Sequence, residues 1–399
     1  MKKIAKLSLV AAVAVVGFTS ANAQSLEEAI KGVETSGSVV YRYNDNDNGV
    51  DSDNDASNNY KIGLNLASKI NEDVKLNTRF IVGSQTTGSF VELDTAGHDG
   101  QADVSLSNVY FGYTGIQNTT VNVGKQGLTT PWTTAIDSDG NEQTGTGILA
   151  LSTVGPVTLA GAYFNQTNLD NSSDSVIAGS TLKDSTKVTS VLKGNESIAT
   201  IGAIAAAGPV TLDAWYLNAQ DLFDTYTVGA KSDLDLSGVK LGVDARYASL
   251  TLDSADNANS MAKIALTAKA GIVNGKVAYA MTDKDGGLTA LDNDATTTLL
   301  GWSITSNGKS DADYWQAVAG VDILSNLNLS ANYGNIQYIA ANDSSIDMEE
   351  EEIYAQLLYK MSKNLSTYVR YGAYTKEIDG ATSKINDDTR GRVQVEYTF

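Results

Sequence analysis

Four arginines occupy polar positions in segments that alternate apolar and polar residues, and their placement suggests a shared role. They are Arg42, Arg79, Arg370 and Arg392. Each lies roughly five to seven residues from the turn-side end of its segment, so a strand rise of about 3.3 Å per residue would bring all four to a similar height. Guanidinium groups that face a pore select ions and orient dipolar solutes. Alternatively, they pair with carboxylates such as Glu396 and only hold the wall together.

Three acids lie together in one segment and could form a wall that faces the arginines. Asp137, Asp139 and Glu142 fall within Leu128 to Thr144, between two alternating segments. If this stretch folded toward the arginines, a negative wall would oppose a positive one, and an electric field would cross the gap between them. We therefore predict a pore constriction with a basic wall and an acidic loop.

Residue types that enzymes need are scarce in this chain. It has no cysteine, which excludes disulfide scaffolds and thiolate metal sites. Its one histidine, His98, lies in a polar stretch with the composition of a solvated loop. A barrel enzyme of the lipase or protease type would need a histidine beside a nucleophile or a positioned water. We predict that the protein is not an enzyme.

One acidic stretch resembles a calcium-binding loop in part. Residues 44–55 are rich in Asn and Asp, but an EF-hand loop begins with Asp and ends with Glu, and these positions hold Asn44 and Asp55. No helical pattern flanks the stretch. We expect no cofactor, with a calcium ion in this loop as the alternative.

The elements that would position these residues are segments with an apolar residue at every second position. This period predicts β-strands with one apolar face. Val74 to Val82 and Val393 to Phe399 are examples. The segments run about ten residues, the length that crosses a membrane at a tilt, whereas globular strands average about five to six. The pattern predicts an all-β fold, a transmembrane antiparallel β-barrel whose closed sheet leaves no unpaired edge.

Two kinds of connection alternate along the chain, short turns and long polar loops, as in outer-membrane barrels. Counting strands between them gives eighteen, with both chain ends on the turn side, although sixteen or twenty strands stay open. Thr297 to Ile304 also reads as a strand, but we assign it to a long folded loop from Asp283 to Asp311. Turns are expected near residues 71–73, 115–118, 155–156, 208–209, 237–238, 274–275, 325–326 and 362–364.

The N-terminus and the net charge indicate the compartment. Three lysines, an apolar run from Leu7 to Phe18 and the sequence Ala21-Asn22-Ala23 have the form of a secretory signal peptide. We predict cleavage after Ala23, which makes residues 1–23 the signal peptide and residues 24–399 one barrel domain. The mature chain would hold 25 basic against 47 acidic residues, a net charge of −22. Such a charge argues against a nucleic-acid partner.

Three blocks of sequence resemble the major outer membrane porin family of Campylobacter and related epsilonproteobacteria. They are residues 25–43, residues 123–133 with Gly145-Thr146-Gly147, and residues 390–399. The resemblance implies an eighteen-stranded barrel of the bacterial outer membrane, usually a trimer, that acts as a diffusion pore with a cation preference. It also implies an inward-folded third loop, and a C-terminal assembly signal that contains Tyr397 and Phe399.

These features together predict an outer-membrane porin, a passive channel for ions and small hydrophilic solutes with a modest cation preference. Its expected partners are outer-membrane lipid, lipopolysaccharide, the barrel assembly machinery and further copies of the chain in a homotrimer. The alternative is a barrel that serves mainly as a surface adhesin or structural protein. Adhesion would favour apolar patches in the loops, and the loops are mostly Asn, Asp, Ser, Gly and Thr.

Overall fold

A computed structural model describes residues 32–50, 54–84, 87–93, 103–172, 192, 194–253, 258–340 and 343–399, which form one antiparallel sheet. Its only helix in these ranges is α2 (Leu169–Ser172), and no described helix is long and apolar enough to cross a membrane. The strands are β1 (Glu34–Asn48), β2 (Asn54–Lys69), β3 (Val74–Gly83), β4 (Val91–Glu92), β5 (Asp103–Ile116), β6 (Thr119–Gly127), β7 (Thr144–Val154), β8 (Val157–Thr167), β9 (Ile198–Ala207), β10 (Val210–Ala219), β11 (Phe223–Leu236), β12 (Val239–Leu252), β13 (Ala258–Ala270), β14 (Val273–Thr282), β15 (Ser310–Leu324), β16 (Leu327–Ile339), β17 (Asp347–Lys360), β18 (Leu365–Ile378) and β19 (Lys384–Thr398).

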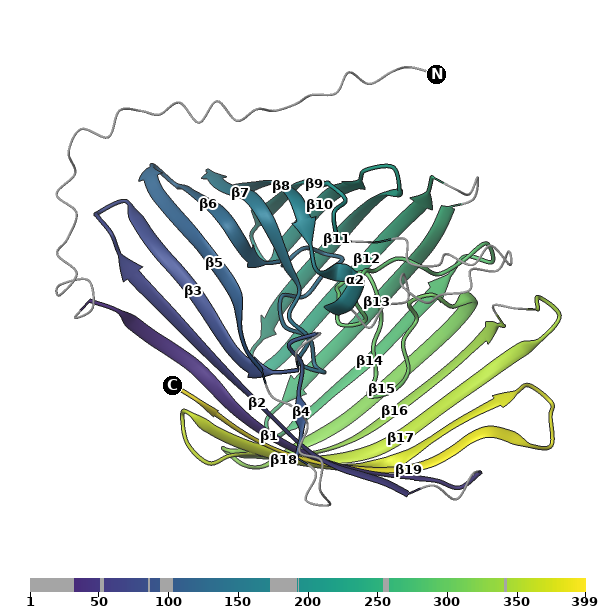
Figure 1. The fold of residues 1–399 in the computed structure, drawn as a ribbon. Coiled ribbons are helices and arrows are strands. Elements are labelled where there is room, and N and C mark those ends of the chain that lie inside the picture. Colours follow the sequence, from purple (N-terminus) through teal and green to yellow (C-terminus); the bar gives the residue numbers. More distant parts are fainter. Residues whose placement is uncertain are drawn as a thin grey trace.

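Pairing between the first and last strands closes the sheet into a barrel (Figure 1). β1 pairs with β19 on one side and with β2 on the other. The two-residue β4 only extends the sheet beside β2, so eighteen strands form the ring. The predicted count is confirmed, and residues 297–304 lie in a loop, as we assigned them.

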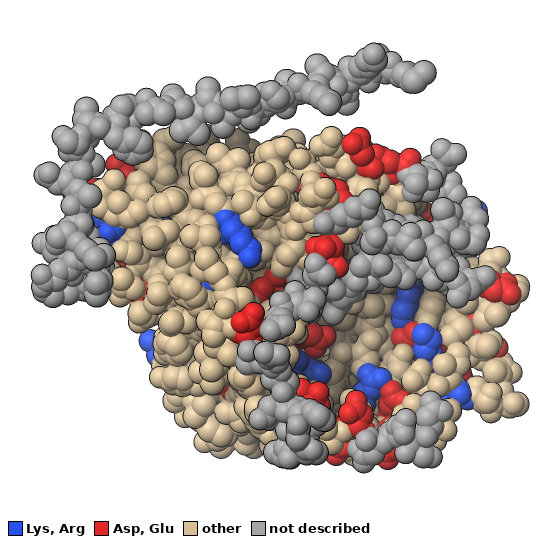
Figure 2. Space-filling view, in the orientation of Figure 1, with Lys and Arg blue, Asp and Glu red and all other residues tan. Residues whose placement is uncertain are grey.

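The period-two alternation separates a lipid-facing surface from a polar lumen. On β1, the side chain of Tyr41 points outward and is 39% exposed, whereas the next residue, Arg42, points inward and is 6% exposed. Pairing keeps each face uniform, because Tyr41 lies opposite Val395 of β19 and Tyr60 of β2. Figure 2 shows charged side chains gathered around the hollow, while the outer wall beside it carries few. An apolar exterior and a closed ladder of backbone hydrogen bonds are what a bilayer requires of a barrel.

One predicted turn is wrong, because the real turn lies three residues earlier in the chain. Asn274 and Gly275 lie inside β14, and the turn is formed by Gly271 and Ile272. Gly271 has a φ of 57°, a conformation in which glycine lacks the steric cost of other residues. The Asn-Gly pair is a strong hairpin signal, but the pairing of Gly275 with Ala268 and Ala319 overrides it.

Polar residues at the loop-side ends of strands belong to the sheet more often than their composition suggests. Asn44 pairs with Ser57, and Asn46 with Asp55, so β1 and β2 continue into the stretch that resembled a calcium loop. Residues 51–53 and His98 lie outside the described residues. In the described part of the chain, no group of three or more acidic or histidine side chains is placed to hold a metal ion.

Two long loops fold into the barrel. The third loop (residues 128–143) joins β6 to β7, and the seventh loop (residues 283–309) joins β14 to β15. They are hydrogen-bonded to each other, since Leu291 N donates to Trp132 O over 2.9 Å and Thr297 N donates to Pro131 O over 3.1 Å. The predicted inward fold of the third loop is confirmed, and the seventh loop accompanies it.

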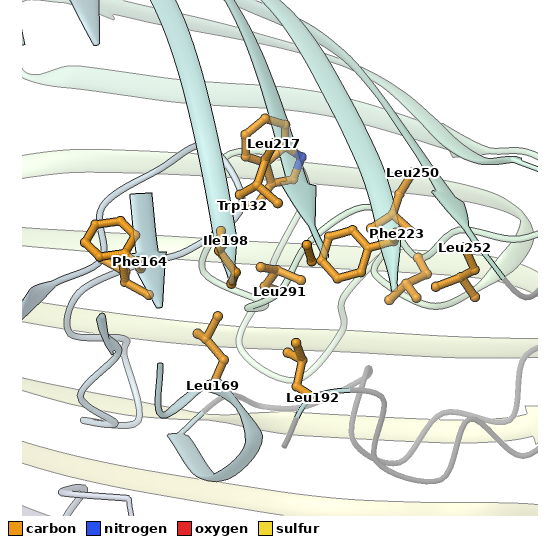
Figure 3. Close-up of a cluster of buried hydrophobic side chains, with 13 residues drawn as sticks. Trp132, Phe164, Leu169, Leu192, Ile198, Leu217, Phe223, Leu250, Leu252 and Leu291 are labelled. Carbon is orange, nitrogen blue, oxygen red and sulfur yellow. The ribbon is translucent and has the colours of Figure 1, made fainter. Parts of the chain in front are cut away.

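An apolar cluster inside the barrel holds both loops against one side of the wall. Trp132 of the third loop and Leu291 of the seventh are buried with Leu217, Phe223 and Leu250, which project from β10, β11 and β12 (Figure 3). Burial of each large apolar side chain contributes about 1.5–3 kcal/mol. The cluster therefore closes this side of the lumen and leaves the opposite wall, along β18, β19 and β1, to line open space.

Deleting Phe399 is expected to impair barrel closure. Gly37 N donates to Phe399 O over 2.9 Å, and Phe399 N donates to Gly37 O over 3.1 Å, so the last residue completes the ladder between β19 and β1. Its ring stacks on that of Tyr397 with centroids 5.9 Å apart. A Cβ on Gly37 would lie 2.8 Å from the Phe399 ring, so the glycine leaves room for it.

The amount of folded barrel can be measured from the altered mobility of unheated membrane samples in gel electrophoresis. The deletion should lower this amount several-fold, because it exposes a strand edge. Phe111→Ala is a matched control, since Phe111 also faces outward but lies within the wall and is 49% exposed. Equal amounts of folded protein from the deletion and the control would contradict the assembly role.

Candidate pore constriction

Glu142 of the third loop is in direct contact with two cations of the barrel wall. Its carboxylate accepts hydrogen bonds from Arg79 Nη2 over 2.8 Å, from Lys61 Nζ over 2.6 Å and from Ser107 Oγ over 2.7 Å. Burial alone would raise the pKa of Glu142, but the hydrogen bonds and charges of Arg79 and Lys61 hold it below its ordinary value. Glu142 therefore stays ionised and anchors the third loop to β2 and β3.

Two neighbouring residues of β2 hold Arg79 in position for its contact with Glu142. A Cβ on Gly63 of β2 would lie 2.6 Å from Arg79 Nη2, so the glycine makes room for the guanidinium group. Asn65 Oδ1 accepts a second hydrogen bond from Arg79 Nη1 over 2.9 Å. Arg79 also lines a turn-side hollow of about 450 Å³ with Asn108 and Tyr110. It does not line the cavities beside the other three arginines.

The two aspartates of the third loop have different surroundings. Asp137 is 6% exposed and accepts hydrogen bonds from Asn141 N over 2.8 Å and Asn141 Nδ2 over 2.7 Å, so it stabilises a turn within the loop. Asp139 has a side chain that is 53% exposed and lies 3.4 Å from Arg42 Nη1. Of the three predicted acids, Asp139 alone lines the cavities beside the arginines of the wall.

Arg370 and Arg392 face the lumen without a carboxylate partner among the described residues. Arg370 donates to Gln356 Oε1 over 2.7 and 3.0 Å, and Arg392 donates to Asn44 Oδ1 over 2.7 Å. Both guanidinium groups lie against Trp302 of the seventh loop, 4.9 and 5.8 Å from its ring centroid. Neither guanidinium group is therefore in an ion pair with a described carboxylate.

Two cavities of about 550 Å³ each meet beside these residues. One, which we call the waist cavity, is lined by Arg42, Arg370 and Arg392 together with Lys263 and Lys276. The other lies along Asn46, Tyr374 and Arg390. Residues common to both linings mark the passage between them: Ser138, Asp139, Asn293, Leu300, Trp302 and Arg392.

The seventh loop supplies residues of this passage that the sequence analysis missed. Its tip is fixed to β17, because Glu352 accepts hydrogen bonds from Trp302 N over 2.9 Å and Ser303 N over 2.7 Å. A Cβ on Gly301 would lie 1.8 Å from Glu352 Oε1, so only glycine permits this approach. The alternating pattern at residues 297–304 was the available signal, but it indicated a strand and not a docked loop.

The predicted site residues thus lie in several separate places in the structure. Arg42 and Asp139 lie together at the passage, and Arg370 and Arg392 lie beside them. Arg79 and Glu142 are joined in a buried ion pair, so at this point the two predicted walls touch where we expected a gap. Asp137 is turned into its own loop. Tyr397 and Phe399 lie at the barrel seam.

Several solved structures have a similar fold. Acinetobacter baumannii OccAB3 is 14% identical with a TM-score of 0.75, and the match covers 92% of this chain and 99% of that one. Pseudomonas aeruginosa OpdO is 19% identical with a TM-score of 0.71, covering 92% and 97%. The outer membrane protein opdK from Pseudomonas aeruginosa is 15% identical with a TM-score of 0.70, covering 92% and 98%. At these identities the likeness is one of fold.

Sequence comparison gives a family for the whole chain. No curated protein matches it in sequence. A family model described as Campylobacter major outer membrane protein matches residues 1–399. The match includes all three blocks that carried the resemblance noted above.

Proposed function

Since the chain belongs to the Campylobacter major outer membrane protein family, we propose that this outer-membrane barrel is a passive channel for ions and small hydrophilic solutes, not an enzyme. The observation that carries the proposal is the pair of cavities that meet at Asp139, Trp302 and Arg392, because they offer a polar route past both inward loops. A barrel that served only as an adhesin or a structural protein would need no such route. The cavities therefore favour the channel over that alternative.

We further propose that the channel has a modest preference for cations, which its acidic mouth supplies. The mature chain would carry a net charge of −22, and its long loops are rich in Asp. Arginines at the passage oppose this field, which keeps the preference small. Exposed charges act over about 10 Å at 0.1 M salt and less at higher salt. The preference should therefore weaken as the salt concentration rises, because the mouth is screened more than the passage.

The zero-current potential of the purified protein in planar bilayers under a salt gradient tests this selectivity. Asp139→Asn should move the potential toward anion preference, and Arg42→Gln should move it toward cation preference. Lys75→Gln is a control for the loss of a positive charge, because Lys75 is 48% exposed and paired with Glu34 away from the passage. If neither passage variant moves the potential more than the control does, Asp139 and Arg42 do not set the selectivity.

The route to the membrane is also part of the proposal. Residues 1–23 would be removed on export, after which the barrel assembly machinery would insert the chain into a bilayer that contains lipopolysaccharide, as a homotrimer. Peptide mass mapping of outer-membrane fractions should find Gln24 as the first residue. Recovery of Met1 to Phe18 from that fraction would contradict cleavage.

A further inference from the structure

The lining of the waist cavity holds more basic than acidic side chains. Five cationic side chains line it: Arg42, Lys263, Lys276, Arg370 and Arg392. Asp139 and Asp294 are the two acids of the lining. Asp294 accepts hydrogen bonds from Ser138 N over 3.1 Å and Ser138 Oγ over 2.9 Å, which directs its carboxylate to the third loop.

Four of these cations donate only to neutral acceptors within the described residues. Lys263 Nζ donates to Thr298 O over 2.8 Å, and Lys276 Nζ donates to Gln316 Oε1 over 2.8 Å. Arg370 and Arg392 donate to the side-chain amides of Gln356 and Asn44. These carbonyl oxygens orient the cations without neutralising them. Asp244 attracts both lysines and Glu352 attracts Arg370, but none of these pairs is in direct contact, so an anion in the cavity would add a direct ionic contact to each group.

The two arginines are also held in fixed positions. Arg370 Cζ lies 4.9 Å from the ring centroid of Trp302, 5.0 Å from that of Tyr354 and 5.3 Å from that of Tyr368. These aromatic rings and the amide partners limit the rotamers of the guanidinium group, which lowers the entropy lost when an anion binds. Both Nη groups of Arg392 lack a protein acceptor among the described residues, so they can donate to a carboxylate in the cavity.

We propose that the waist cavity is a binding site for small organic anions with two or more carboxylates, which are held between the arginine pair and the two lysines before they pass. The proposal rests on the proposed channel function and names a class of solute for it. Two carboxylates are favoured over one because the cations come from two separate parts of the wall, β18 and β19 on one side and β13 and β14 on the other. The cavity of about 550 Å³ is large enough for such a molecule.

Succinate is a suitable probe, with glucose as a neutral probe. Isothermal titration calorimetry on the folded protein in detergent should detect succinate binding and no glucose binding. In planar bilayers, succinate should interrupt the single-channel current in a concentration-dependent way at constant ionic strength. Arg370→Gln with Arg392→Gln should weaken binding roughly a hundredfold, since each charged hydrogen-bonding group accounts for about one factor of ten.

Lys263→Gln tests the other side of the site without disturbing the arginine–aromatic contacts, and it should weaken binding roughly tenfold. Lys75→Gln should leave binding unchanged. Absence of succinate binding by the folded wild-type protein, or equal binding by all variants, would overturn the proposal. Binding in detergent with no current in bilayers would support the site and count against the channel function. A normal current with no succinate binding would support the channel function and overturn the proposed site.

Discussion

Replacing Glu142 by glutamine is expected to loosen the third loop and raise the single-channel conductance. The substitution leaves Arg79 and Lys61 buried, at 8% and 5% exposure, without the carboxylate that both contact. Removing one partner of a buried ion pair typically costs about 3–5 kcal/mol, because the remaining charge is uncompensated. The barrel should still form, since its ladder doesn't depend on Glu142, but the loop should leave its docked position more often.

Single-channel recording can measure the effect as higher mean conductance and greater current noise. Asp139→Asn is the matched control, because it removes an acid from the same loop at a site where the side chain is 53% exposed and makes one contact of 3.4 Å. A pair with a half-exposed carboxylate and a single contact of 3.4 Å contributes less than the fully buried pairs of Glu142. Equal current noise in the two variants would mean that Glu142 does not anchor the loop.

The same ion pairs predict how the channel responds to acid. The folded-state pKa of Glu142 lies below its ordinary value because of Arg79 and Lys61. Its stabilisation is therefore fully present above the unfolded pKa of about 4.3 and is lost as the pH falls through the lower, folded value. Conductance should stay constant from about pH 7 to pH 5 and change only in stronger acid. The acid-induced change should be absent from the Glu142→Gln variant.

Replacing Trp132 by alanine is expected to release the third and seventh loops together. Trp132 is fully buried in the apolar cluster, and its carbonyl oxygen accepts the hydrogen bond from Leu291 N. A buried Trp→Ala substitution costs about 3–5 kcal/mol through lost contacts and the cavity that it leaves. Because both loops share this cluster, the conductance should rise further than in the Glu142→Gln variant, where only the third loop loses its anchor.

Trp315→Ala separates this effect from a general weakening of the barrel. Trp315 lies on β15, faces outward and is 52% exposed, so its loss should lower stability without changing the conductance. Heat-modifiability in gel electrophoresis checks that both variants fold. A Trp132→Ala channel with wild-type conductance would show that the apolar cluster does not hold the loops in place.

The local pattern of residue types was sufficient to predict the strands of this barrel, their faces and their number. Strand faces follow from alternation at every second residue, because a pleated strand directs neighbouring side chains to opposite sides. Most turns follow from Gly, Pro, Asn and Ser between the alternating segments. Counting one strand between each short turn and the next long loop then gives eighteen strands, with both chain ends on the turn side. The inward direction of Arg42, Arg370 and Arg392 is a consequence of the same alternation. Asn274-Gly275 was misread because register, which depends on neighbouring strands, overrode a local signal.

Only the tertiary structure decided what fills the barrel. Alternation says nothing about a loop, whose path depends on contacts between residues far apart in sequence, such as Trp132 with Leu291 and Ser303 with Glu352. For the same reason the sequence could place Arg79 and Glu142 on facing walls but could not show that they touch. The sequence by itself therefore determined the wall of the channel and the direction of its charges. The packing of two loops inside that wall decided which charges are neutralised and which remain exposed to a solute.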